Sequence, residues 1–232
     1  MSLMSRKYGK NKYLKLTHIS ESKFRDILKH FCLDIPANKT ALLTNTNRNT
    51  VNRLYNLLRE YVVRLGLEEQ KKFTGEVEVD ESYFGARRVR GKKGRGAKGK
   101  TPVVGLLKRK GMVFTKVVKN CTRGELMPII KGKVLTNSLI YTDGWRSYDG
   151  LILSGYNHKR IHHHENEFAR GKNHVNGIES FWSFAKRRIS KFNGLRNEKF
   201  LLHLKESEYR WNHKEENLYK LMLKNLRKRS LN

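Results

Sequence analysis

Three acidic residues in three separate segments have the residue type and the setting for metal-dependent chemistry. Glu76, Glu78 and Asp80 alternate with two valines, as on a β-strand that carries its acids on one face. Asp143 follows the short apolar run SLIYT, and Glu179 lies in a later segment with helical periodicity. In α/β sheets, functional side chains commonly lie at the ends of strands, and Glu179 lies at the edge of the apolar stripe of its helix, where it can point toward such strand ends. Asp80, Asp143 and Glu179 are therefore candidates for one site. Taken singly, each is more simply an ordinary strand-end, turn or surface acid.

A set of carboxylates of this kind suits a reaction at a phosphodiester. Two divalent cations about 3.5–4 Å apart can activate the attacking oxygen, stabilise the leaving oxygen and neutralise charge on phosphorus. Hard cations prefer oxygen ligands, so Asp80, Asp143 and Glu179 are predicted ligands of Mg²⁺, for which Mn²⁺ can substitute. Lys186 lies on the same side of the predicted helix as Glu179 and is predicted to hold a phosphate.

The composition points to a polyanionic partner. The chain has 232 residues, with 50 Lys and Arg against 21 Asp and Glu, and a formal net charge of +29. Nucleic acid is the favoured partner, with a ribosomal role or an anionic membrane surface as alternatives. Because 38% of the residues are hydrophobic, the chain is not a disordered basic tail as a whole. No stretch approaches the ~20 apolar residues of a membrane span, so we expect a cytoplasmic, nucleoid-associated protein without a membrane partner.

The two cysteines bear on metal binding and redox chemistry. Cys32 and Cys121 are too few for a zinc ribbon or a disulfide framework, so no structural zinc is expected. A run of histidines, residues 162–164 with Glu165 and His174 nearby, is an alternative metal site or a solvated loop.

The N-terminal part of the chain has the pattern of a helix-turn-helix domain. A basic lead, residues 1–19, precedes three helical segments within residues 20–66, and the polar run TNTNRNT separates the last two. Arg48, Asn52 and Arg53 lie off the apolar stripe of the third helix, so they are candidates for contacts with bases or phosphates. A plain three-helix unit with a solvated polar face is the alternative.

After a linker at 67–75, the pattern predicts an α/β domain over residues 76–213. A hairpin, a helix near 122–134 and two helices at about 175–189 and 197–213 are expected, with an irregular His-rich stretch after Asp143. Residues 214–232 predict a further basic amphipathic helix. The segment 85–100 holds eight Lys or Arg and five Gly, which is typical of a flexible basic loop. Its basic side chains are predicted DNA contacts: Arg87, Arg88, Arg90, Lys92, Lys93, Arg95 and Lys98.

Three ordered blocks resemble a family of bacterial insertion-sequence transposases, the one numbered fifteen-ninety-five. They are VEVDESYFG (Val77–Gly85), IYTDGWRSY (Ile140–Tyr148) and HVNGIESFWSFAKRR (His174–Arg188). The resemblance implies a DDE-type catalytic domain with a ribonuclease H-like fold, a mixed sheet flanked by helices, here preceded by the small all-α domain. It also implies Mg²⁺-dependent cleavage at transposon ends and transfer of the 3′-OH strand into target DNA. The partners implied are double-stranded DNA and further copies of the chain, as a dimer or larger assembly on DNA.

The resemblance assigns roles by position. Asp80, Asp143 and Glu179 become the first, second and third acids, and Lys186 the basic residue that follows. Asn176 is a second candidate for the third position, because some relatives carry Asn there. Further predicted DNA contacts are Arg187, His163 and Trp145.

Several alternatives remain open from the sequence alone. Glu78 or Glu81 can replace Asp80 as a ligand, depending on strand register. Trp145 and Tyr148 either stack on a splayed base or pack on the sheet, and Trp182 is expected in the core. Two alternative functions remain for the whole protein. The first is a non-catalytic DNA-binding protein, such as a domesticated or decayed transposase. The second is another nuclease with the ribonuclease H-like fold.

Overall fold

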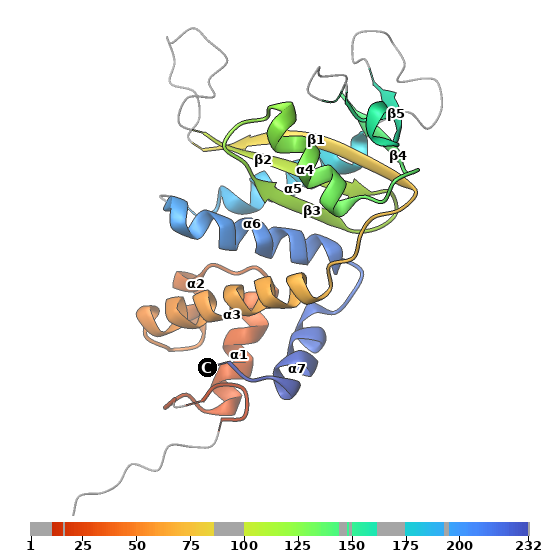
Figure 1. The fold of residues 1–232 in the computed structure, drawn as a ribbon. Helices are drawn as coiled ribbons and strands as arrows, with labels where there is room; N and C mark the ends of the chain where they lie inside the picture. The colour runs from red at the N-terminus through yellow and green to blue at the C-terminus, as the bar shows by residue number, and fades with distance from the viewer. Residues whose placement is uncertain are drawn as a thin grey trace, which may run out of the picture. The chain divides into compact units, whose positions relative to one another are not determined.

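The computed structural model divides the chain into two compact units (Figure 1). One unit comprises residues 1–68 together with 213–232, and the other comprises residues 69–212. The structure describes residues 11–15, 17–85, 100–143, 148, 150–161, 175–192 and 195–231.

The first unit contains the three helices expected from the N-terminal pattern. They are α1 (Glu21–Cys32), α2 (Ala37–Leu43) and α3 (Arg48–Glu68). Ser20 caps α1 by accepting a hydrogen bond from the Lys23 backbone amide at 3.2 Å. The apolar stripes of α1 and α3 are buried, and the rings of Phe31 on α1 and Tyr55 on α3 are in edge-to-face contact with their centroids 5.1 Å apart.

The C-terminal helix is part of this same unit. α7 (Leu218–Lys228) is capped by Asn217, whose side chain accepts from the Lys220 amide, and it packs on α1. Beyond α7, the Leu231 amide donates to the Tyr13 carbonyl at 2.8 Å. The two ends of the described chain are therefore held side by side.

The second unit is built on a five-stranded mixed sheet with strand order β3-β2-β1-β4-β5. Its strands are β1 (Glu76–Phe84), β2 (Thr101–Lys108), β3 (Val113–Val117), β4 (Leu139–Thr142) and β5 (Asn157–Arg160). The first three are antiparallel neighbours, whereas β4 lies parallel to β1 and β5 parallel to β4. This order and these directions are those of the ribonuclease H-like fold, which confirms the expected fold class.

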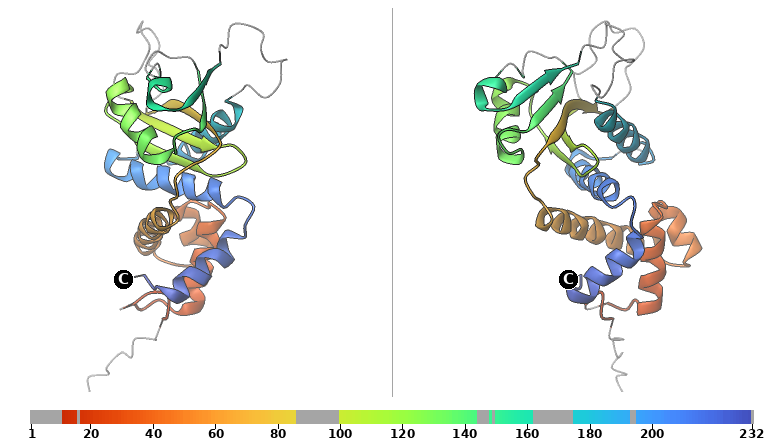
Figure 2. Two further views of the ribbon diagram at one scale, coloured as in Figure 1. Left: turned by 45° about the vertical axis from the view of Figure 1, so that its right-hand side comes forward. Right: turned by 90° about the vertical axis from the view of Figure 1, so that its right-hand side faces the viewer.

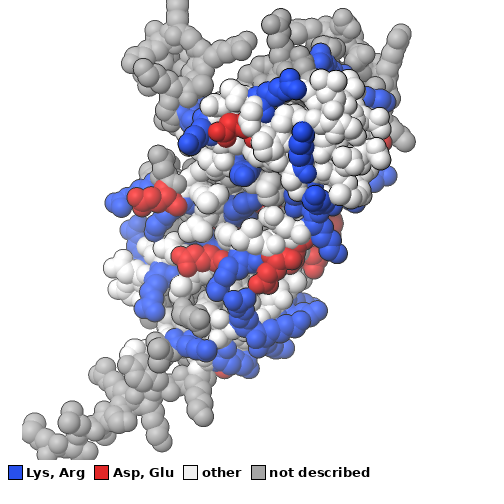
Figure 3. Space-filling view, viewed as in Figure 1, with Lys and Arg blue, Asp and Glu red and all other residues white. Residues whose placement is uncertain are grey.

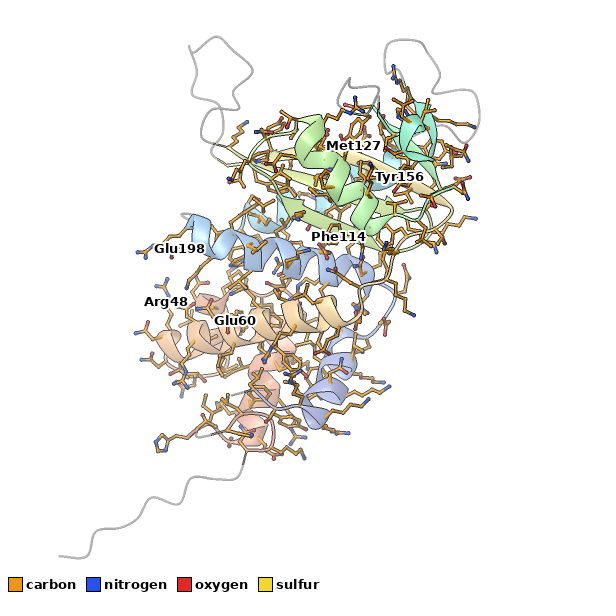
Figure 4. All side chains as sticks on the ribbon, in the orientation of Figure 1. Arg48, Glu60, Phe114, Met127, Tyr156 and Glu198 are labelled. Atoms are coloured by element: carbon orange, nitrogen blue, oxygen red, sulfur yellow. The ribbon has the colours of Figure 1, made fainter. Side chains whose placement is uncertain are left out.

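Helices cover both faces of the sheet (Figure 2). α4 (Arg123–Lys133) lies on one face, while α5 (Asn176–Ile189) and α6 (Asn197–Asn212) lie on the other. Figure 4 labels Met127 and Tyr156, which belong to the core between α4 and the sheet, and Phe114, which packs against that core. The opposite core includes Phe181 and Trp182 of α5 and Leu204 of α6. The central strand β1 is thus buried on both sides.

The structure differs from the sequence expectation at one strand. β5 falls within the stretch expected to be irregular, and its sequence NHKR carries no apolar alternation. Among the described residues it pairs with β4 alone, at the edge of the sheet, so its side chains remain largely exposed and leave no burial signal in the sequence.

Among the helices of the described part of the chain, none has both the length and the apolar character needed to cross a membrane.

Candidate active site

Three carboxylates meet at the point where β4 ends beside β1. One ligand oxygen each from Asp80, Glu81 and Asp143 lies within 4.8 Å of the other two. The registered pairing of β1 with β4 runs from Glu76 opposite Leu139 to Glu78 opposite Tyr141. Since β4 ends at Thr142 while β1 continues to Phe84, Asp143 emerges beside the part of β1 that carries the other two acids.

Asp80 is the acid that faces α5. Its Oδ2 accepts a hydrogen bond from the indole Nε1 of Trp182 at 3.0 Å. Burial, followed by the nearby charge of Asp143, raises the pKa of Asp80 to about 6, and the Trp182 hydrogen bond opposes that rise. A positive charge placed beside this carboxylate would therefore be strongly favoured.

Glu81 is held from the opposite face of the sheet. The hydroxyl of Tyr148, itself fully buried, donates a hydrogen bond to Glu81 Oε1. Burial raises the pKa of Glu81 to about 8, and the charges of Asp143 and Asp80 add to the rise against the lowering effect of the Tyr148 hydrogen bond. Burial and the Glu81 charge also raise the pKa of Tyr148 well above its usual value. Tyr148 therefore remains a hydrogen-bond donor to Glu81 at neutral pH.

The candidates for the third ligand lie in the first turn of α5. Asn176 and Glu179 are both exposed, and Glu179 lies outside the group formed by Asp80, Glu81 and Asp143. Glu179 is nevertheless close enough to Asp80 for its charge to contribute to the raised pKa of that acid. The structure thus brings Asp80 and Asp143 together, with Glu81 beside them, and places Glu179 at the edge of the site.

Two lysines border the same site. Burial lowers the pKa of Lys186, the charge of Asp80 raises it and the charge of Lys100 lowers it. The Lys186 ammonium also lies 5.8 Å from the ring centroid of Phe84, at the end of β1. Arg187 is exposed on the next position of α5. Lys100 is the last residue of the basic segment 85–100 and was not among the predicted DNA contacts.

The remaining predicted contacts fall into two groups. Arg48, Asn52 and Arg53 are exposed along the first two turns of α3 in the other unit. A second group lies outside the described residues, together with the alternative histidine metal site at 162–164: Arg87, Arg88, Arg90, Lys92, Lys93, Arg95, Lys98, Trp145 and His163.

Sequence reasoning missed two contacts at the site. Trp182 does lie in the core, as expected, but its indole N–H also bonds Asp80. Tyr148 packs on the sheet and also bonds Glu81. A buried tryptophan or tyrosine usually forms a hydrogen bond through its N–H or O–H group. Burial of these two residues could therefore have indicated that each has a polar partner.

The donor set fits a hard divalent cation. All three side chains of the cluster offer carboxylate oxygens, and the described part of the chain adds neither histidine nor cysteine to the group. Such oxygen-only sets suit Mg²⁺ and Mn²⁺ better than zinc.

Sequence comparisons identify a family and related proteins. The sequence profile of the ISXO2-like transposase domain matches residues 72–212. A protein of Haemophilus influenzae, described as an uncharacterized transposase-like protein, is 47% identical over 119 residues, covering 51% of this chain and 96% of that protein. A protein of Halobacterium salinarum, described as an uncharacterized protein in transposable element ISH50, is 30% identical over 152 residues, covering 59% of this chain and 52% of that protein.

Two solved structures show distant likeness. The catalytic core domain of HTLV-2 integrase in complex with magnesium has a TM-score of 0.37 and 13% identity, covering 62% of this chain and 89% of that one. The Mos1 transposase paired-end complex with the left transposon end has a TM-score of 0.31 and 10% identity, covering 92% of this chain and 80% of that one. The family match over residues 72–212, which contain the whole acid cluster, carries the identification. This chain belongs to the ISXO2-like transposase domain family of insertion sequences.

Proposed function

We propose that the protein is a DDE-type DNA transposase that cleaves at transposon ends and transfers the freed 3′-OH strand into target DNA. The observation that carries the proposal is the convergence of Asp80, Glu81 and Asp143 within 4.8 Å. The proposal rests also on the family match over residues 72–212.

In this proposal, Asp80 and Asp143 hold Mg²⁺, and a residue on the first turn of α5 completes the ligand set. Glu179 is the first candidate because it is charged and lies near Asp80, and Asn176 is the second. The bound cations supply Lewis acidity and charge neutralisation at the reacting phosphodiester. Glu81, fixed by Tyr148, lies next to both ligands. Its raised pKa of about 8 keeps it largely protonated at neutral pH, and a bound cation would favour its ionised form. Lys186 and Arg187 orient the DNA strand through its phosphates.

DNA binding is proposed for both units. Lys and Arg are spread over the face shown in Figure 3, where they outnumber Asp and Glu. In the helix-turn-helix-like domain, residues 20–66, the exposed side chains of Arg48, Asn52 and Arg53 contact the transposon end. The basic segment 85–100, with Trp145 and His163, contributes to contacts made by the catalytic domain, residues 76–213. Two ends must be joined in one complex, so we expect a dimer or larger assembly on DNA in the nucleoid.

A nicking and joining assay tests the proposal. The substrate is a supercoiled plasmid carrying the coding sequence of the protein with its flanking DNA, incubated with Mg²⁺ or with EDTA. Wild type should nick the plasmid with Mg²⁺ only, while Asp80→Asn and Asp143→Asn should lose nicking by at least 100-fold. Glu198→Gln is the matched control, because Glu198 is an exposed acid at the start of α6 (Figure 4) and should leave nicking unchanged.

The outcomes separate the competing functions. Joining of a 3′-OH end to a second plasmid supports a transposase, whereas nicking without joining indicates another ribonuclease H-like nuclease. Full nicking by both Asp→Asn variants would refute the proposed site. DNA binding without any Mg²⁺-dependent nicking by wild type would indicate a non-catalytic DNA-binding protein.

A further inference from the structure

β1 and α5 are joined by two side-chain hydrogen bonds that lie one helical turn apart. Glu78 Oε2 accepts from the Ile178 backbone amide at 2.9 Å, and Asp80 Oδ2 accepts from Trp182 Nε1 at 3.0 Å. Two residues along a strand advance about 6.6 Å, and four residues along a helix advance about 6 Å. Because these spacings match, the two bonds together fix where α5 lies along β1.

The first bond caps α5 from another element. The N-cap residue Val175 provides no side-chain hydrogen bond, and Ile178 bears one of the amides that the helix itself leaves without an acceptor. Glu78 supplies that acceptor from the strand, although its side chain is almost wholly buried at 1% exposure of the residue. A negative charge at this end of a helix is favoured by the helix dipole.

Glu78 is fully engaged by its neighbours. Its second oxygen accepts from Arg109 Nε at 3.0 Å, and the same guanidinium bonds Glu76 at 2.8 Å. The guanidinium carbon lies 3.8 Å from the ring centroid of Tyr141 on β4. This arrangement ties Glu78 to both strands of the site and leaves it a structural acid, in contrast to Asp80 two residues later.

Two glycines permit the close approach of α5 at both bonds. A Cβ atom at Gly177 would lie 2.9 Å from Glu78 Oε2, and one at Gly105 would lie 2.5 Å from Trp182 Cζ2. Gly105 is the residue of β2 that pairs with Asp80. The absence of a side chain on β2 therefore makes the space in which the indole of Trp182 reaches Asp80.

The candidate third ligands lie between or next to these two attachment points. Glu179 follows Ile178 directly and precedes Trp182 by three residues, and Asn176 precedes Ile178 by two. A small rotation or shift of α5 would therefore change the distance from Glu179 or Asn176 to the Asp80–Asp143 pair.

We propose that Glu78 and Trp182 are positioning residues that hold α5 in the register at which its first turn completes the metal site. Glu78 acts through the α5 amide and Trp182 through the Asp80 carboxylate, and neither contacts DNA. This inference rests on the proposed function, because it gives the register of α5 a role in metal binding.

The test compares each variant with a control that makes the same chemical change elsewhere. Trp182→Phe removes the indole N–H, and Trp211→Phe removes one from a second tryptophan that packs on Phe181 in the same core. Glu78→Leu removes the buried carboxylate acceptor at similar side-chain size, and Glu208→Leu removes one from an acid at 6% exposure that is bonded to Thr115.

Three readouts are measured on the full chain: Mn²⁺ affinity by electron paramagnetic resonance, thermal unfolding, and hydrogen exchange of the Ile178 amide. We expect Trp182→Phe and Glu78→Leu to weaken Mn²⁺ binding about 10-fold or more, as loss of a group that orients a metal ligand does, with the controls within about twofold of wild type. Exchange at Ile178 should accelerate at least about 10-fold in Glu78→Leu and stay unchanged in Glu208→Leu.

The outcomes separate this inference from the proposed function. If wild type binds Mn²⁺ and the two variants lose no more affinity than their controls at equal thermal stability, the positioning role is wrong and the proposed function stands. If Ile178 exchange is equally slow in Glu78→Leu, which has no side-chain acceptor, the capping role of Glu78 is wrong. If wild type binds no Mn²⁺, the proposed function fails and the positioning role fails with it.

Discussion

A single added methyl group at Gly105 should destabilise the unit formed by residues 69–212. The Cβ of Gly105→Ala would lie 2.5 Å from Trp182 Cζ2, 2.8 Å from Trp182 Cη2 and 2.9 Å from Ile178 Cδ1. Ordinary contacts between carbon atoms are about 3.5–4.0 Å, so the indole must retreat by roughly 1 Å. It has little room to do so, because Trp182 is 4% exposed and packs on Phe84 and Phe181.

The size of the effect follows from two opposing contributions. Overpacking a well-filled core costs about 1–3 kcal/mol, and the rigid indole favours the upper part of this range. Replacing glycine by alanine within a strand offsets about 0.5–1 kcal/mol of that cost. The expected net loss is therefore about 1–2 kcal/mol, which corresponds to a Tm lower by about 2–8 °C for a domain of this size.

The assay is thermal unfolding of the full chain, with Gly124→Ala as the matched control. Gly124 lies inside α4, and a Cβ there meets no atom within 4 Å. The same substitution should therefore raise stability at this position, by up to about 1 kcal/mol, because alanine is the better helix former. A Tm for Gly105→Ala equal to or above that of wild type would refute the close packing of Trp182 over β2.

Three further predictions concern ionisation, a buried ion pair and DNA binding. The pKa of the Asp80 carboxyl is about 3.8 in the unfolded chain, and burial followed by the charge of Asp143 raises it to about 6 in the folded chain. Wild-type stability therefore falls as pH rises through this window and stays lower above it. Asp80→Asn should therefore stabilise the protein in EDTA by about 1–3 kcal/mol at pH 8 and by less than about 1 kcal/mol at pH 4, and an equal gain at both pH values in urea unfolding would contradict this. Glu206 forms an ion pair with the buried guanidinium of Arg188. Glu206→Ala should therefore lower the free energy of unfolding in urea by about 3–5 kcal/mol, and a loss below about 1 kcal/mol would contradict the pairing. Arg48→Ala should reduce the slope of log Kd against log salt concentration for a labelled duplex by about 1, whereas Asn52→Ala should leave this slope unchanged. Equal slopes for Arg48→Ala and wild type would exclude a contact between Arg48 and a phosphate.

The sequence was sufficient to locate the elements that carry the site. The alternation around Asp80 predicts a strand, and the periodicity from Ile178 to Ile189 predicts the helix that packs on it. These signals are readable because one side of each element is apolar and buried. The order of the three blocks then indicates the family and the mixed α/β fold, both of which the structure and the family match bear out.

Other features of the site depend on tertiary contacts that have no local pattern. Glu78 and Asp80 are both acids on one face of β1, yet one caps α5 beside Arg109 and the other joins the acid cluster. The sequence leaves Glu81 as an alternative ligand, while its place beside Asp143 depends on where β4 stops. The role of Gly105 is likewise visible only once β2 pairs with β1, because the space it leaves is filled by a residue of α5.

The most direct test of the proposed metal site is the position of Mn²⁺ in crystals of the full chain soaked with that ion, located by its anomalous scattering. We predict a peak within ligand distance of carboxylate oxygens of both Asp80 and Asp143, with either Glu179 or Asn176 of α5 turned toward it. Mn²⁺ bound elsewhere, with no anomalous peak at the Asp80 and Asp143 carboxylates, would contradict the metal site and the catalytic function proposed from it.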